Sequence, residues 1–190
     1  MPADEFPYRT ASAFRAALRD RLAALARGGG HGLDELQRQF AYDRLLARMF
    51  TAPDADRWIL KGAGALLARL PDARHSRDID LAFTRPPSPR SSDTAQPLDD
   101  ATTSLRTALD VDLGDHFRFE ISRISPLPET AKGHRVHVVA YLGPRYATFH
   151  VDVVVGTAMT GAPQPGTPLI PLDIPGLQRP TYRLFPLADH

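Results

Sequence analysis

The segment that most constrains this chain covers residues 58–83, and it closes on an Asp-Ile-Asp-Leu run that begins at Asp78. In this run two carboxylates alternate with aliphatic side chains, and alternation with a period of two predicts a β-strand. Asp78 and Asp80 should therefore point to the same face of a sheet, roughly 7 Å apart along the strand. Because adjacent carboxylates repel each other unless a cation lies between them, the pair predicts a site for Mg²⁺ (or Mn²⁺).

The start of the same segment has the composition of a phosphate-binding turn. A short apolar run is followed by Lys61, Gly62 and Gly64, and then by apolar residues at helical spacing. Where a strand turns into a helix, free backbone N–H groups and the helix dipole favour a phosphate group. A phosphate site beside a metal site is what phosphoryl or nucleotidyl transfer requires. Each part also has a structural explanation, because tight turns and close packing need glycine as well.

Two common nucleotide-binding motifs are excluded, because the segment contains no G-x-x-x-x-G-K-[ST] run and has Leu67 where a Rossmann fingerprint needs its third glycine. The combination instead resembles the nucleotidyltransferase motif of the DNA polymerase β-like superfamily, in which a glycine pair at a helix start precedes Asp-x-Asp on the next strand. The longer match, LKG at residues 60–62 with SRDIDL at residues 76–81, is similar to AbiEii-type toxins, including the mycobacterial MenT group. Short runs at residues 8–10, 13–18 and 44–48 also resemble that family, whereas Ala63 departs from its usual Lys-Gly-Gly.

The resemblance implies an α+β protein with the polymerase β-like nucleotidyltransferase fold, in which a mixed β-sheet packs with helices and an N-terminal helical pair. It further implies transfer of a nucleotide from an NTP to tRNA or another RNA, with the tRNA 3′ acceptor end as the favoured target. Such toxins block translation until an antitoxin protein neutralises them. In the family a further helix that carries a lysine usually follows, and this chain ends before one.

Within this reading, Lys61, Gly62 and Gly64 would hold the triphosphate. Ser76, two residues before Asp78, is expected to hydrogen-bond a phosphate oxygen, and Arg77 is expected to contact the substrate.

Residues 135–155 form the second informative stretch. Two alternating apolar runs flank Gly143-Pro144-Arg145, which is a hairpin signal. The alternation gives the hairpin an apolar face of valines and a polar face that carries Arg135, His137, His150 and Asp152. A carboxylate among valines is costly unless it is paired. Pairing with arginine is one interpretation. Metal coordination beside Asp78 and Asp80 is the other, which we favour because polymerase β-like enzymes take a third carboxylate from a following strand. Arg135 and His137 would then face the nucleotide phosphates.

Composition bounds the remaining possibilities. The chain has 190 residues, is 43% hydrophobic and contains no cysteine, which predicts one ordinary core and excludes disulfides and thiolate metal sites. No apolar run has the length of a membrane span and the N-terminus lacks a signal-peptide pattern, so we expect a cytoplasmic protein without membrane contact. The net charge is only +1, yet arginines outnumber acidic residues around residues 57–85. Such a local positive rim suits a polyanionic substrate.

The chain is expected to divide into N-terminal helices (residues 1–56), a nucleotidyltransferase core (57–156) and a Pro- and Gly-rich C-terminal extension (157–190). The second helix, from about residue 33 to residue 50, carries Arg38, Arg44 and Arg48 at helical spacing. We expect these arginines on a solvated face, with RNA contact as the alternative. The Pro- and Ser-rich residues 85–97 read as a loop that either folds over the site or is a tolerated insertion.

The leading hypothesis is therefore a metal-dependent nucleotidyltransferase toxin whose catalytic and metal-binding residues are Asp78, Asp80 and Asp152. One alternative is a shortened, non-catalytic member that acts as a partner-binding module. Another is a phosphotransferase or glycosyltransferase that uses Asp-x-Asp to hold the metal of a nucleotide.

Overall fold

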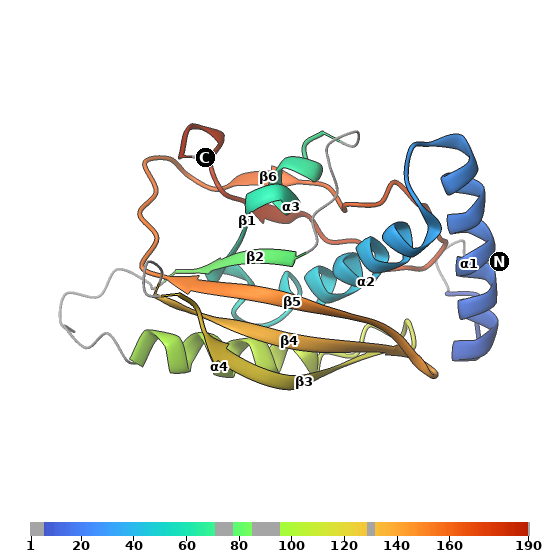
Figure 1. Cartoon of the computed structure of the whole chain (residues 1–190), viewed down its shortest axis with the longest axis horizontal. Coiled ribbons are helices and arrows are strands. Elements are labelled where there is room, and N and C mark those ends of the chain that lie inside the picture. Colours follow the sequence, from blue (N-terminus) through green and yellow to red (C-terminus); the bar gives the residue numbers. More distant parts are fainter. Residues whose placement is uncertain (1–5, 71–77, 85–95, 129–131, 190) are drawn as a thin grey trace.

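A computed structural model describes residues 6–70, 78–84, 96–128 and 132–189. These residues form a mixed α+β fold around a seven-stranded sheet in the order β3-β4-β5-β2-β1-β7-β6 (Figure 1). The strands are β1 (Trp58–Lys61), β2 (Asp78–Phe83), β3 (Phe117–Pro126), β4 (Gly133–Leu142), β5 (Arg145–Val155), β6 (Gln164–Gly166) and β7 (Tyr182–Leu184). The helices are α1 (Ala11–Gly28), α2 (Leu33–Met49), α3 (Gly62–Leu67) and α4 (Gln96–Leu109), with short 3₁₀ turns at Ala55–Arg57 and Leu187–Asp189.

The two sequence motifs meet at the centre of this sheet. Strand β2 pairs with β1 in the antiparallel direction and with β5 in the parallel direction. Strands β4 and β5 form the expected hairpin, and β3 pairs with β4 in the antiparallel direction at the edge. The alternation of residues 135–155 is confirmed, because Val136, Val138, Val151 and Val153 are all buried on one face. The opposite face of the hairpin carries the polar residues Arg135, His137, His150 and Asp152.

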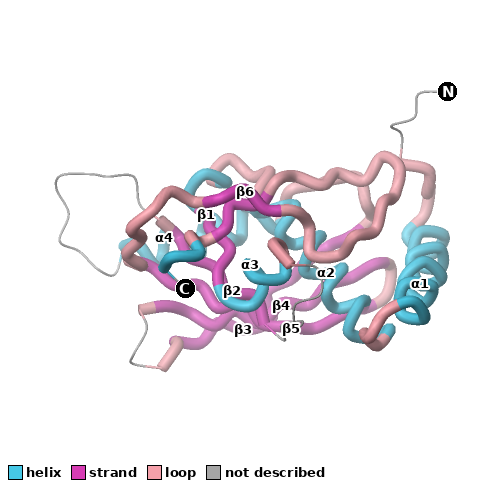
Figure 2. The backbone as a smooth tube through the Cα atoms, turned by 90° about the horizontal axis from the view of Figure 1, so that it is seen from above, coloured by secondary structure: helices cyan, strands magenta, loops and turns pink. Residues whose placement is uncertain are grey.

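Helices cover the apolar face of the sheet. Figure 1 draws α4 behind β3 and β4, and Figure 2 shows α1 at one end of the molecule beside α2. The first helix begins after Thr10, whose Oγ1 atom accepts a hydrogen bond from the N–H of Ala13 at 3.2 Å. Its buried residues Phe14, Leu18 and Leu22 lie three to four positions apart and join the main core.

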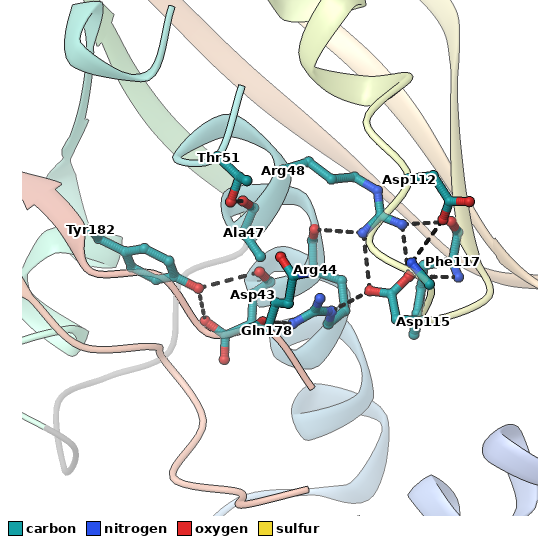
Figure 3. A network of polar contacts seen from close by, with 11 residues as sticks. Asp43, Arg44, Ala47, Arg48, Thr51, Asp112, Asp115, Phe117, Gln178 and Tyr182 are labelled. Atoms are coloured by element: carbon teal, nitrogen blue, oxygen red, sulfur yellow. Dashed lines mark hydrogen bonds and ion pairs between the residues drawn. The ribbon is translucent and has the colours of Figure 1, made fainter. Parts of the chain in front are cut away.

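The second helix corrects one prediction of the sequence analysis. Arg44 and Arg48 are not on a solvated face, because each is only 1% exposed. Both bind the buried carboxylate of Asp115: the Nε atom of Arg44 donates to it at 2.6 Å, and the Nη2 atom of Arg48 donates at 2.7 Å (Figure 3). Two arginines and one carboxylate therefore join α2 to the loop that precedes β3, and neither arginine is available to RNA.

The same helix also holds the C-terminal residues. Asp43 accepts hydrogen bonds from the N–H groups of Leu169 and Ile170 at 2.6 and 2.8 Å and from the hydroxyl of Tyr182 at 2.7 Å. Figure 3 shows Tyr182 on the side of α2 opposite to Asp115, and Gln178 beside Arg44, whose Nη1 atom donates to the carbonyl of Gln178 at 2.7 Å. The Pro- and Gly-rich residues after 156 show no periodic pattern that would indicate a strand. The structure nevertheless adds β6 and β7 to the sheet, with β7 parallel to β1.

Among the helices in the described part of the chain, none combines the length and the apolar character that crossing a membrane requires.

Candidate active site

Four polar side chains form one row across the centre of the sheet. Lys61 of β1 lies opposite Asp80 of β2, Asp80 lies opposite Asp152 of β5, and Asp152 lies opposite Arg135 of β4. Residues in register on neighbouring strands point to the same face, about 5 Å apart. Residues far apart in the sequence are thus brought together on the face of the sheet opposite to the main core, as the two alternating patterns predicted.

A second row runs beside the first. Asp78 of β2 lies opposite His150 of β5, and His150 lies opposite His137 of β4. The Nδ1 atom of His150 is 3.3 Å from the Oδ1 atom of Asp78, and the two imidazole rings are 4.4 Å apart between centroids. The three predicted carboxylates therefore share one face, with a histidine pair on the side toward the sheet edge.

Gly62 has a specific physical reason to be glycine. Its φ angle is +56°, a backbone conformation that residues other than glycine rarely adopt. A Cβ atom at this position would stand only 2.1 Å from the Oδ2 atom of Asp80. The turn therefore lets the backbone approach the carboxylate closely. Because α3 is only six residues long, this contact explains the glycine better than a helix dipole does.

Gly64 has a different environment. A Cβ atom there would approach the Cδ1 atom of Leu60 at 3.2 Å. This agrees with the close-packing explanation for the second glycine. The structure thus assigns separate tasks to two residues that the sequence analysis treated as one phosphate cradle.

The electrostatics of the row centre on Asp80. Burial raises the pKa of this carboxyl, and the nearby charges of Asp152 and Asp78 raise it further, while Lys61 and Arg135 oppose the rise. Burial also lowers the pKa of Lys61, against the attraction of Asp80. The Nζ atom of Lys61 lies 4.7 Å from the centroid of the Phe185 ring. The centre of the row thus carries an excess of negative charge that a cation would relieve.

Asp152 is already paired. Its two carboxylate oxygens accept hydrogen bonds from the Nε and Nη2 atoms of Arg135, each at 2.7 Å. The hydrogen bonds and charge of Asp152 raise the pKa of Arg135, so the arginine remains charged. The structure is thus compatible with both interpretations of Asp152. Its carboxylate lies beside Asp80, as metal coordination would require, and it forms a bidentate ion pair with Arg135.

A pocket of about 470 Å³ opens on the β1 side of the carboxylates. Its lining includes Lys61, Gly62, Asp80 and Asp152, together with residues that the sequence analysis missed: Val154, Thr157, Ala158, Phe185 and Asp189. Most of these belong to the C-terminal residues, where no periodic pattern marked them. A larger cavity of about 910 Å³ lies where α1, α4 and β3 meet, and none of the carboxylate-row residues lines it.

The donor chemistry of this site fits a hard divalent cation, because Asp78, Asp80 and Asp152 offer carboxylate oxygens, and burial together with the acidic neighbours raises the pKa of Asp80. In the part of the chain that the structure describes, no group of three or more His, Asp or Glu side chains is already arranged to hold a metal ion. Two predicted site residues, Ser76 and Arg77, lie outside the described residues.

A mixed sheet that presents three carboxylates beside a glycine turn is consistent with a nucleotidyltransferase-like fold. The model of one protein family, the nucleotidyl transferase AbiEii toxins of type IV toxin–antitoxin systems, matches residues 44–190. The chain belongs to this family, which confirms the resemblance seen in its motifs.

Among solved structures, the crystal structure of JHP933 from Helicobacter pylori is similar to this chain at 13% sequence identity, with a TM-score of 0.42. The match covers 80% of this chain and 52% of JHP933, so the chain spans about half the length of that protein. No curated protein matches the sequence.

Proposed function

We propose that this toxin transfers a nucleotide from an NTP to the 3′ end of an RNA, with the acceptor end of tRNA as the first substrate to test. The observation that carries the proposal is the row in which Lys61, Asp80 and Asp152 lie in register on three neighbouring strands. Membership in the AbiEii family supports nucleotidyl transfer as the reaction class. The proposed consequence is a block of translation that an antitoxin protein relieves.

Each part of the site has a task in this reaction. The pocket beside Lys61 and Gly62 takes the triphosphate, whose negative charge the lysine offsets. Asp78, Asp80 and Asp152 would hold Mg²⁺ or Mn²⁺, which when bound stabilises charge on the phosphoryl oxygens. The 3′ hydroxyl oxygen of the RNA forms a bond to the α-phosphorus, the bond from that phosphorus to pyrophosphate breaks, and the hydroxyl proton passes to water.

The direct test is incubation of the protein with total tRNA, Mg²⁺ and each labelled NTP in turn. We expect label in RNA, and we expect Asp78→Asn, Asp80→Asn and Asp152→Asn each to lose nearly all of it. The losses should not add in combined variants, because the groups act as a unit. Absence of label with every NTP and every RNA would contradict the proposal.

Asp80→Asn offers an internal control for folding. The raised pKa of Asp80 means that its ionised form is unfavourable in the folded protein, so loss of this charge should increase stability near neutral pH. An inactive Asp80→Asn protein that melts at a higher temperature than the wild type would show that activity was lost through chemistry.

The ion pair between Asp152 and Arg135 keeps a second candidate open: a non-catalytic member of the family that acts through a partner. In that case Asp152→Asn would leave toxicity in cells unchanged. The nucleotidyltransferase proposal expects the same substitution to abolish toxicity, so growth of cells that express the variant separates the two.

A further inference from the structure

The polar face of the sheet continues past the carboxylates to the β3 edge. The second row, Asp78–His150–His137, extends to Arg123 of β3, which lies opposite His137. The charge of Arg123 acts on His137, in agreement with their register. We name the three residues His150, His137 and Arg123 the histidine–arginine row.

This row lies on the uncovered side of the sheet. Helix α4 contributes buried residues to the core on the opposite face, and Figure 1 shows no described helix in front of β3, β4 and β5. Arg123 is exposed, whereas both histidines are half-buried. Arg123 makes no hydrogen bond or ion pair with another described residue. The row thus presents two aromatic rings and a free guanidinium on an accessible surface that begins at Asp78.

The row and the NTP pocket lie on opposite sides of the carboxylates. The pocket is lined by Lys61, Gly62 and Phe185 on the β1 side and reaches Asp80, Asp152 and Val154, whereas the row runs from Asp78 through His150 of β5 to β4 and β3. In-line transfer requires the attacking hydroxyl and the leaving pyrophosphate on opposite sides of the α-phosphorus. If the triphosphate enters from the β1 side, the acceptor strand must approach from the β5 side.

We propose that the histidine–arginine row binds the single-stranded 3′ end of the acceptor RNA, with the guanidinium of Arg123 on a backbone phosphate and the ring of His137 against a base. This proposal rests on the proposed function for the identity of the site. Single-stranded nucleic acids are bound by aromatic rings that stack on bases and by cations that follow the backbone. The row supplies both groups on one strand-to-strand path that ends at Asp78.

The test measures binding without chemistry. A short fluorescein-labelled RNA with a single-stranded 3′ overhang is titrated with the protein in the absence of NTP and divalent cation, and its anisotropy is followed. Arg123→Gln should weaken binding and lower the slope of log Kd against log salt by about one. His137→Ala should weaken binding about tenfold, as expected for loss of one stacked base. A blunt duplex of the same sequence should bind weakly to all three proteins.

Arg19→Gln is the matched control, because Arg19 is an exposed arginine on α1, whose buried residues face the core. Equal effects of Arg19→Gln and Arg123→Gln would show a general charge effect and overturn the proposal. The proposal would also be overturned if neither Arg123→Gln nor His137→Ala changed the affinity for RNA. The same holds if these variants lost affinity for the antitoxin and kept their affinity for RNA.

Failure of the proposed function can be told apart from failure of this proposal. If RNA binding depends on Arg123 and His137 but no nucleotide is incorporated, the histidine–arginine row remains an RNA-binding surface and the proposed transfer reaction is rejected. Incorporation with normal RNA affinity in both variants would do the reverse.

Discussion

At the scale of single residues, Gly62 gives the sharpest test of the site. Gly62→Ala would place a Cβ atom 2.1 Å from the Oδ2 atom of Asp80 and would impose a positive φ angle on alanine. We expect a loss of stability of about 1–2 kcal/mol from the backbone alone. We also expect the rate of nucleotide transfer to fall by at least a hundredfold, because the carboxylate of Asp80 must move. Each increase of about 1.4 kcal/mol in the activation free energy lowers the rate tenfold.

Gly64→Ala is the matched control for this prediction. Its Cβ atom would meet only the end of the Leu60 side chain, at 3.2 Å, and Gly64 has no positive φ angle. We expect Gly64→Ala to cost less stability and to retain most of the activity. Thermal melts and initial rates of incorporation measure both effects, and equal damage by the two substitutions would contradict the role assigned to Gly62.

Arg135 permits a prediction about metal affinity. Both oxygens of Asp152 are engaged by this arginine, so a cation must compete with the ion pair. Arg135→Gln should therefore increase the affinity of the nucleotide-free protein for Mn²⁺, measured by electron paramagnetic resonance of the unbound ion. Arg123→Gln, on the same face but not in contact with a carboxylate, should leave this affinity unchanged. Weaker Mn²⁺ binding by the Arg135 variant would contradict the prediction.

At the scale of elements, α2 is held by ionic contacts that stability measurements can detect. Burial alone would raise the pKa of Asp115, but hydrogen bonds and charges from Arg48 and Arg44 outweigh it, so the pKa is lowered. A carboxyl with a lowered folded pKa contributes stability that is present above its unfolded pKa, about 4, and that is lost as the pH falls through the folded value.

Asp115→Asn should therefore destabilise the protein by about 3–5 kcal/mol near neutral pH, because it leaves two buried arginines without their carboxylate. The difference between wild type and variant should shrink as the pH falls from about 4 toward the lowered pKa of folded Asp115, because the unfolded wild-type chain binds a proton at Asp115 before the folded protein does. Urea denaturation across this pH range measures the difference. A constant difference at all pH values would show that the ionised carboxylate is not what stabilises α2.

The same elements show what the sequence could and could not predict. The β4–β5 hairpin and the strand of Asp78 and Asp80 were predictable, because alternation with a period of two is a local signal. The burial of Arg44 was not, because its partner Asp115 lies 71 residues away in the chain. Strand β7 has only three residues and takes its place by pairing with β1, so no alternation could reveal it.

At the scale of the whole molecule, the C-terminal residues tie the site to the core. Leu169, Ile170, Ile174, Tyr182 and Leu184 are buried in the main core, and Phe185 lines the pocket beside Lys61. Arg69, which follows α3, donates a hydrogen bond to the carbonyl of Phe185 at 2.6 Å. The expected boundary at residue 156 thus marks a change in amino-acid composition. Residues on its two sides pack into the same core and are joined by hydrogen bonds.

The last prediction tests whether residues 157–190 form a separable extension. A chain that ends at residue 156 would lose β6 and β7, and it would leave the buried carboxylate of Asp43 without the three donors that Tyr182, Leu169 and Ile170 supply. An unsatisfied buried acceptor alone costs about 1–3 kcal/mol, and the exposed apolar side chains add to this cost. We therefore expect the shortened chain to lack a cooperative thermal transition in circular dichroism.

Tyr182→Phe isolates one part of that loss. It removes the hydroxyl that donates to Asp43 but keeps the ring that stacks on Phe50 at 5.2 Å between centroids. This variant should remain folded and lose about 1–3 kcal/mol of stability in urea, because the buried carboxyl group of Asp43 loses one of its donors. A residue 1–156 chain that melts cooperatively near the wild-type temperature would show that the C-terminal residues are an extension after all, and that α2 and the carboxylate row need no support from them.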